Sequence, residues 1–238
     1  MLETFKNDNV KYSHNQAIDL LKGVCIIFVV FTHFSWTAKE RLVMGIPFWI
    51  DMAVPIFMLI SGYVNTLSYN RKQIKSFADA YAVKNWLKSF VRYTVPYLII
   101  FLLEAVVICI ASSLKLVPDM TVKWYEYITA LFTGGWGQGS YYYPVLLQFL
   151  VFFPCIYFVV KKYAVKGLLA CLLANLLWEV VKIPLQISVA FYRLNFFRYI
   201  YLVAFGVYTA LYGASNRKVS NRRINGNFIS YRNSVSKL

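Results

Sequence analysis

The sequence predicts an all-α fold, a bundle of apolar helices that crosses a membrane. Of the 238 residues, 59% are hydrophobic and only 15% are charged, and the mean hydropathy is +0.54. So few charges could not cover the apolar surface of a soluble domain of this size. We therefore expect one polytopic membrane domain at residues 1–213, followed by a basic polar tail at 214–238.

Six apolar segments approach the roughly 20 residues that a helix needs to cross the hydrocarbon core. They lie at residues 18–36, 49–69, 91–112, 143–160, 167–181 and 197–212. The first segment is long, keeps a polar N-terminal arm and is followed by five more, which argues against a cleaved signal peptide. The sequence thus predicts about six helices, and the tail, which has no apolar period, is expected to be disordered.

Lysine and arginine mark the side of the membrane on which each connection is expected. They gather after the second segment, after the fourth segment and in the tail, at Arg71, Lys72, Lys75, Lys84, Lys88, Arg92, Lys161, Lys162, Lys166, Arg217, Lys218, Arg222, Arg223, Arg232 and Lys237. The positive-inside rule then predicts a multi-pass protein of the cell membrane with both termini in the cytoplasm. The formal net charge of +15 follows from this topology, so we expect membrane lipid and not nucleic acid as a partner.

The cysteines do not indicate a metal site or a disulfide framework. Cys25, Cys109, Cys155 and Cys171 lie far apart in apolar runs and have no CxxC spacing,. We expect them to be packing residues and expect no bound metal.

Two ionisable residues stand in the first predicted helix, in the stretch DLLKGVCIIFVVFTH at 19–33. Eleven positions separate Lys22 from His33, which corresponds to three helical turns plus about 20°, so both side chains project from one face about 16 Å apart. Asp19 can pair with Lys22 near the cytoplasmic interface. An imidazole so deep in a membrane helix is either functional or a neutral packing residue that hydrogen-bonds between helices.

Other polar residues at membrane depth allow similar alternatives. Asp51 is expected near the level of His33, where it either orients the imidazole in an acid–base dyad or ends the helix at the interface. Glu104 lies well inside the third segment and is expected to line a cavity or to pair with a cation. Gln148 and Asn175 are expected to hydrogen-bond between helices.

Four stretches carry a family resemblance: DLLKGVCIIFVVFTH at 19–33, PIFMLISGYV at 55–64, GSYYYPVLLQF at 139–149 and FFRYIYLVAFGVYTAL at 196–211. Together they resemble the membrane-bound acyltransferase family 3. The first helix of that family typically reads as Arg or Lys, ten residues and then His, and its second helix carries an F-x-x-SGY/F signature. Because members of the family look like ten-helix proteins, the resemblance implies that this chain is truncated at its C-terminal end.

The resemblance implies transfer of an acyl group, usually acetyl, from cytoplasmic acyl-CoA to a hydroxyl of a cell-surface or exported carbohydrate. By position, Lys22 and His33 match the first-helix pair, Ser61 and Gly62 match the SG motif, and Lys88 and Arg92 loosely match an R-x-x-R pattern. We expect Lys22, Lys88, Arg92, Ser61 and Gly62 to bind the donor. The candidate catalytic residues are His33, Asp51 and Glu104, with His33 as general base or, alternatively, as an acyl carrier.

Two further alternatives are compatible with the sequence. A non-catalytic membrane bundle for carbohydrate export, or an inactive acyltransferase fragment, would also hold polar groups at membrane depth. The aromatic run TGGWGQGSYYY at 133–143 is expected to form either an acceptor platform, because aromatic faces stack on sugar rings, or an ordinary aromatic belt.

Overall fold

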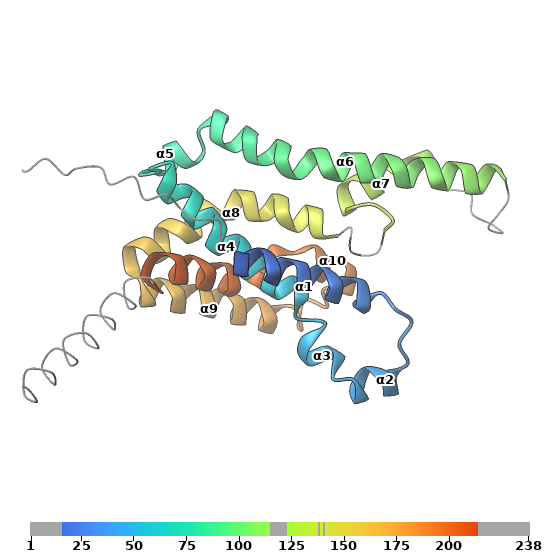
Figure 1. The fold of residues 1–238 in the computed structure, drawn as a ribbon, viewed down its shortest axis with the longest axis horizontal. Coiled ribbons are helices and arrows are strands. Elements are labelled where there is room, and N and C mark those ends of the chain that lie inside the picture. The colour runs from blue at the N-terminus through green and yellow to red at the C-terminus, as the bar shows by residue number, and fades with distance from the viewer. Residues whose placement is uncertain (1–15, 115–122, 138, 140, 214–238) are drawn as a thin grey trace, which may run out of the picture. The chain divides into compact units, whose positions relative to one another are not determined.

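The structure, a computed structural model, describes residues 16–114, 123–137, 139 and 141–213, and in this part of the chain it contains helices and no strand (Figure 1). The all-α class is therefore confirmed. The described residues fall into two compact units, which divide between Val54 and Pro55. The predicted tail at 214–238 lies outside the described residues.

Three helical stretches are long and apolar enough to cross a membrane in the part of the chain that is described: Ile46–Arg71, Val83–Ser113 and Tyr142–Tyr163. Two more helices, α1 (Gln16–Thr32) and α9 (Val165–Val181), have 17 residues each. At 1.5 Å per residue these two extend about 25 Å, slightly less than the hydrocarbon core. The six-crossing topology with both termini inside stays a prediction.

The first unit contains α1 and two short helices, α2 (Ala38–Val43) and α3 (Ile46–Trp49). The prediction of a helix to residue 36 is wrong at its end, because α1 stops at Thr32 and residues 33–36 form a turn in which Trp36 Nε1 donates to Phe31 O at 2.7 Å. A capping box between Thr37 and Glu40 then starts α2,.

The second unit contains most of α4 (Ala53–Arg71) and all later elements. These are α5 (Phe77–Ala80), α6 (Val83–Ser113), α7 (Trp124–Thr133), α8 (Tyr142–Tyr163), α9, α10 (Val189–Leu194), the 3₁₀ helix η1 (Phe196–Tyr199) and a helical run at 200–213. The single residue Ala164 joins α8 to α9, and the two helices lie side by side (Figure 1).

Two glycines allow α4 and the run at 200–213 to cross closely. A Cβ added to Gly62 would lie 2.3 Å from Val203 O, and one added to Gly206 would lie 2.1 Å from Leu59 O. Both distances are far below van der Waals contact, so only glycine fits at this crossing. Such close approach of small residues is how many membrane helices pack.

The core of the second unit lies between α4, α8, η1 and the run at 200–213. Its largest fully buried side chains include those of Met58, Val145, Phe149, Tyr157, Val160, Phe196, Val203 and Val207. The predicted interhelical role of Gln148 is confirmed, since Nε2 donates to Leu194 O at 2.6 Å and Oε1 accepts from Phe196 N at 3.0 Å. Asn175 Oδ1 accepts from Tyr201 N at 3.4 Å, also between elements.

The cysteines are all free. Cys25 and Cys171 are buried, in keeping with the packing role expected of them, whereas Cys109 and Cys155 are exposed. For these two the expected burial is wrong. Cys155 Sγ lies 3.8 Å from the Tyr81 hydroxyl.

Candidate functional site

Of the two ionisable residues of the first predicted helix, Lys22 lies in the second turn of α1 and His33 lies just past its end. Lys22 Nζ is 3.5 Å from Asp19 Oδ1, which is the ion pair expected from the sequence. His33 follows the last residue of α1, its backbone N donates to Val30 O at 3.1 Å, and its side chain is exposed. The imidazole therefore stands just past the end of the helix and not inside it.

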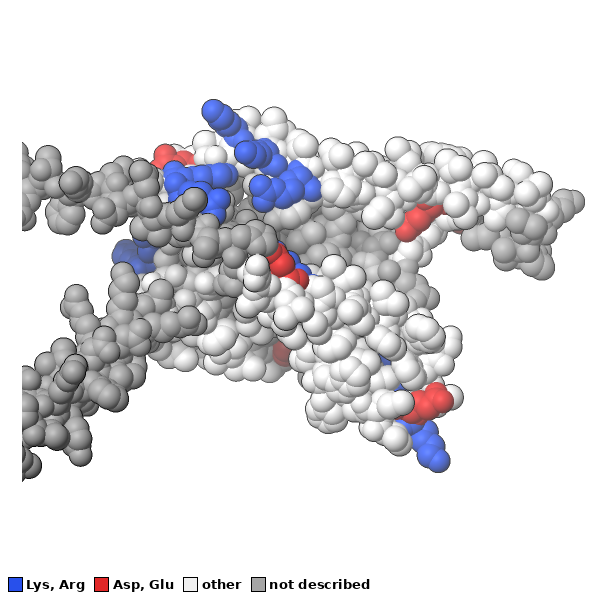
Figure 2. Space-filling view, in the orientation of Figure 1, with Lys and Arg blue, Asp and Glu red and all other residues white. Residues whose placement is uncertain are grey.

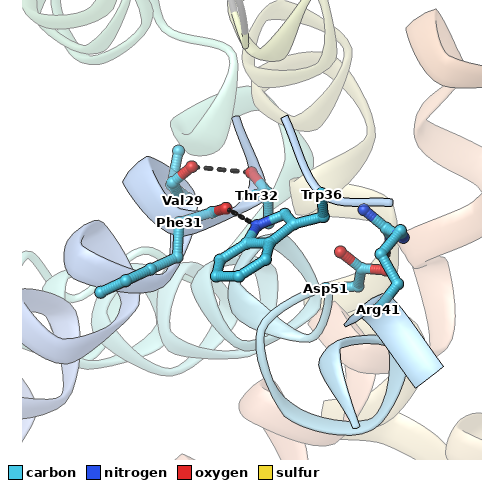
Figure 3. Close-up of polar contacts among 6 residues, drawn as sticks. All are labelled: Val29, Phe31, Thr32, Trp36, Arg41 and Asp51. Atoms are coloured by element: carbon cyan, nitrogen blue, oxygen red, sulfur yellow. Dashed lines mark hydrogen bonds and ion pairs between the residues drawn. The ribbon is translucent and has the colours of Figure 1, made fainter. Parts of the chain in front are cut away.

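Asp51 forms an ion pair that the sequence analysis did not predict. Its Oδ2 accepts from Arg41 Nη2 at 2.7 Å, and both side chains are half-buried (Figure 3). The pair closes the loop of α2 and α3, which separates the two residues by ten positions. No local sequence pattern indicates this contact, because it depends on the turn at Gly45, whose φ of 60° is left-handed,. The dyad of Asp51 with His33 stays a prediction.

Ser61 and Gly62, expected to bind the donor, lie in the middle of α4. Gly62 is the glycine of the close helix crossing, and its carbonyl accepts from Thr66 Oγ1 at 2.8 Å. The Ser61 carbonyl accepts from Asn65 Nδ2 at 2.8 Å, and the Ser61 side chain faces the Tyr142 hydroxyl of α8. The structure thus gives Gly62 a packing function, and donor binding by this motif stays a prediction.

A cavity of about 420 Å³ lies in the second unit, where α6 faces the start of α8. The stripe of α6 that lines it contains Tyr93, Pro96, Tyr97, Ile100, Phe101 and Glu104. The opposite wall contains Gly134, Gly139, Tyr142, Tyr143 and Leu146. Spacings of three and four place the α6 residues on one helical face, about 16 Å long from Tyr93 to Glu104. The volume falls in the usual range of small-molecule sites.

Stacked aromatic rings give the cavity rigid walls. Tyr97 and Tyr143 stack at 3.7 Å between ring centroids with an interplanar angle of 9°, and Phe101 stacks on Trp136 at 5.3 Å and 15°. The Tyr97 hydroxyl donates to Leu131 O at 2.7 Å, and the Tyr143 hydroxyl donates to Thr94 Oγ1 at 3.2 Å. These bonds fix the rings on both sides of the cavity.

The carboxylate of Glu104 is the one carboxylate among the residues that line the cavity. It lies at the end of the cavity that is farther from the start of α6. Oε2 accepts from two backbone amides of the glycine-rich segment, Trp136 N at 3.1 Å and Gly137 N at 3.3 Å. Of the two roles expected for Glu104, the structure shows the first: Glu104 lines a cavity, and among the described residues it binds amides and not a cation. Backbone amides carry no residue-type signal, so the sequence could not have indicated these partners.

Three cations meet near the start of α6. Lys72 follows α4, and Lys88 and Arg92 stand one turn apart on α6. Burial, and then the positive charges of Lys88 and Arg92, lower the pKa of the Lys72 ammonium from its usual range,. Figure 2 shows Lys and Arg side chains gathered over α5 and the start of α6. The sequence did not indicate Lys72 as a member of this cation cluster, because the link to Lys88 depends on how α4 meets α6.

Among the described residues, no group of three or more His, Cys, Asp or Glu side chains is arranged to hold a metal ion.

Long apolar helices, an aromatic cavity within them and a carboxylate at membrane depth define the class of the molecule as a helical membrane protein. The comparison with known families makes this specific. The family model described as "Acyltransferase domain", of acyltransferase family 3, matches residues 15–230, and the chain belongs to this family. It is therefore a membrane acyltransferase. The searches of curated proteins and of solved structures gave no match.

Proposed function

We propose that the chain transfers an acyl group, most simply acetyl, from cytoplasmic acyl-CoA to a hydroxyl of a cell-surface or exported carbohydrate. The observation that carries the proposal is the layout of α6. The cation cluster of Lys72, Lys88 and Arg92 lies at its start, and the lined cavity begins at Tyr93, the next residue. The charged phosphates of the donor require the cations, and a second reactant requires a cavity close to them.

The cation cluster would bind the CoA phosphates. Three positive charges in one place attract a multiply charged anion, and a phosphate beside Lys72 would offset the repulsion from the two other cations. Lys22 of α1, in the first unit, is a further cation proposed for donor binding. From Arg92 to Glu104 the helix rises about 18 Å. This distance separates the proposed phosphate site from the carboxylate at the other end of the cavity.

His33 would be the general base. A neutral imidazole near pH 7 can take the proton of an attacking hydroxyl, which is worth roughly 10² to 10⁴ in rate. The hydroxyl oxygen attacks the thioester carbonyl, the C–S bond breaks, and the CoA thiolate takes up the proton. Asp51 and Glu104 are the further candidate catalytic residues, as carboxylates that could orient the base or the acceptor.

Transfer of radiolabelled acetyl from acetyl-CoA to the cell's own glycan fraction, measured with purified membranes, tests the proposal. His33→Gln should reduce transfer about a hundredfold or more while the protein remains in the membrane. Arg92→Met should raise the KM for acetyl-CoA, and the effect should shrink at high salt because screening already weakens charge contacts. Lys166→Met, which removes one positive charge from the exposed side of α9, is the matched control.

If the unmodified chain transfers acetyl and the His33→Gln variant still does so, the imidazole is not the base. Binding of the glycan without any transfer of label would reject the enzyme and favour the non-catalytic export bundle.

A further inference from the structure

The cavity between α6 and α8 has the chemistry of a site for a polar ring compound. Tyrosine phenols and phenylalanine provide flat apolar walls, and Glu104 provides one strong hydrogen-bond acceptor among them. A purely apolar ligand such as an acyl chain gains nothing from a carboxylate at the end of its site. A hydroxyl-rich ring is bound by both the aromatic walls and the carboxylate, because its C–H faces pack on aromatic rings and its hydroxyls donate to the carboxylate.

Glu104 is prepared to accept such a bond. The amides of Trp136 and Gly137 both donate to Oε2, and among the described residues Oε1 has no hydrogen-bond partner. The two amides orient the carboxylate, so Oε1 is held in place before a ligand arrives. A bond to a charged acceptor that is already oriented is stronger than one between neutral groups.

The four tyrosine hydroxyls of the cavity wall already have partners in the protein, which for Tyr93 is Asn65 and for Tyr142 is Ser61. Tyr97 donates to Leu131 O and Tyr143 donates to Thr94 Oγ1, so these rings offer faces and edges and not free donors. Glu104 is therefore the group that selects the ligand. This selection favours a ligand that brings its own donors, as a sugar does, over one that carries acceptors only, such as a thioester group.

We infer that this cavity is the acceptor site, in which a hexopyranose ring packs against the walls of α6 and α8 and donates one hydroxyl to Glu104 Oε1. The inference rests on the proposed function in taking the acceptor to be a carbohydrate. It adds the location of the site and the residue that recognises the ring. Glu104 here is a binding residue, whatever group removes the proton.

Direct binding tests the site without any transfer reaction. The full chain in detergent is mixed with methyl glucoside, and saturation-transfer NMR measures which ligand protons lie against the protein. Methyl glucoside should bind, and cyclohexanol, a ring of the same size with one hydroxyl, should bind at least about tenfold more weakly. Glu104→Gln should weaken methyl glucoside binding about tenfold or more, since it removes the charged acceptor.

Matched variants separate loss of the site from loss of the fold. Glu126→Gln changes a glutamate that likewise accepts a backbone amide, from Lys123 N at 3.1 Å, but that does not line the cavity. It should bind methyl glucoside as the unmodified chain does. Leu146→Trp fills the cavity and should abolish sugar binding. Leu103→Trp places the same ring on the outer face of α6, where Leu103 is 62% exposed, and should not.

Equal binding of methyl glucoside to the unmodified chain, Glu104→Gln and Leu146→Trp would overturn the inference, and so would no binding to any of them. Competition of the sugar by pantetheine in the unmodified chain would also overturn it and assign the cavity to the donor arm. Loss of sugar binding in the two cavity variants without any acetyl transfer would keep the inference and reject the proposed function. If acetyl is transferred and the KM for the acceptor is unchanged in Glu104→Gln, the proposed function is kept and the inference is rejected.

Discussion

The helices of the second unit pack against one another in two opposite ways. Where α4 crosses the run at 200–213, Gly62 and Gly206 bring the backbones so close that a single Cβ would lie 2.3 or 2.1 Å from a carbonyl oxygen. Where α6 faces α8, large rings hold the helices apart around a cavity of about 420 Å³. The first arrangement leaves no space for a ligand, whereas the second leaves a cavity that can hold one.

The SG motif lies at the close crossing, whereas the space for a ligand lies at the cavity. The SG signature at Ser61 and Gly62 was expected to bind the donor, yet its glycine fits against Val203. Close packing of α4 fixes the helix that carries Ser61, whose side chain faces Tyr142 on the cavity wall. A rigid crossing behind a site keeps its walls in place, which a binding site needs if its groups are to be oriented before the ligand arrives.

The largest effect is expected at the close crossing. Gly206→Ala adds a methyl group 2.1 Å from Leu59 O, and the obstacle is backbone, which cannot rotate away as a side chain can. Overpacking of a core costs typically about 1–3 kcal/mol, and we expect this change to reach at least the upper end of that range. The loss should appear as a low yield of monodisperse protein and a lower melting temperature in detergent.

The matched control lies in the same helical run. A Cβ at Gly213 would meet nothing within 4 Å, so Gly213→Ala should leave the melting temperature unchanged or slightly raised, since alanine favours a helix,. Equal melting temperatures for Gly206→Ala and Gly213→Ala would show that the crossing is looser than the structure indicates.

A smaller effect is expected at the cavity wall. Tyr97→Phe keeps the ring that stacks on Tyr143 but removes the hydroxyl that donates to Leu131 O at 2.7 Å. The loss of one such bond costs about 1 kcal/mol, and the Leu131 carbonyl loses a donor at the end of α7. Hydrogen exchange should show faster exchange of amides at 130–135, while those of the glycine crossing keep their rates. Faster exchange at both places would mean that the two regions are not independent.

The sequence indicated the long helices well and the short ones poorly. Hydropathy placed the fourth segment at 143–160, close to α8 at Tyr142–Tyr163, but started the third at 91, eight residues after α6 begins at Val83. The first two turns of α6 carry Lys84 and Lys88, and an apolar window does not register a charged helical turn. The helices α2 and α5 were missed for a related reason. Their capping boxes, from Thr37 to Glu40 and from Ser76 to Asp79, are local signals that a hydropathy scan does not detect,.

The site was indicated in part. Glu104 was singled out because a carboxylate inside an apolar segment is costly, and the structure places it on the cavity,. Its partners are backbone amides more than thirty residues away. The contact of Gly62 with Val203 spans a still longer separation. Contacts of this kind depend on tertiary packing, and one sequence read without relatives contains no signal for them.

The smallest effect is expected at the second ring of the stacked pair, Tyr143. Tyr143→Phe removes a hydroxyl whose bond to Thr94 Oγ1 is longer, at 3.2 Å, and keeps the stacking on Tyr97 at 3.7 Å. Thr94 can then turn its hydroxyl to its own helix, as threonine does in membrane helices, so no donor or acceptor is left unpaired. We expect less than about 0.5 kcal/mol in stability, measured as the melting temperature in detergent. Tyr143→Leu removes the ring as well and should cost more, because an aromatic pair contributes about 0.5–1.5 kcal/mol beyond its buried area. Equal losses in the two variants would mean that the hydroxyl, and not the stacked ring, holds the cavity open.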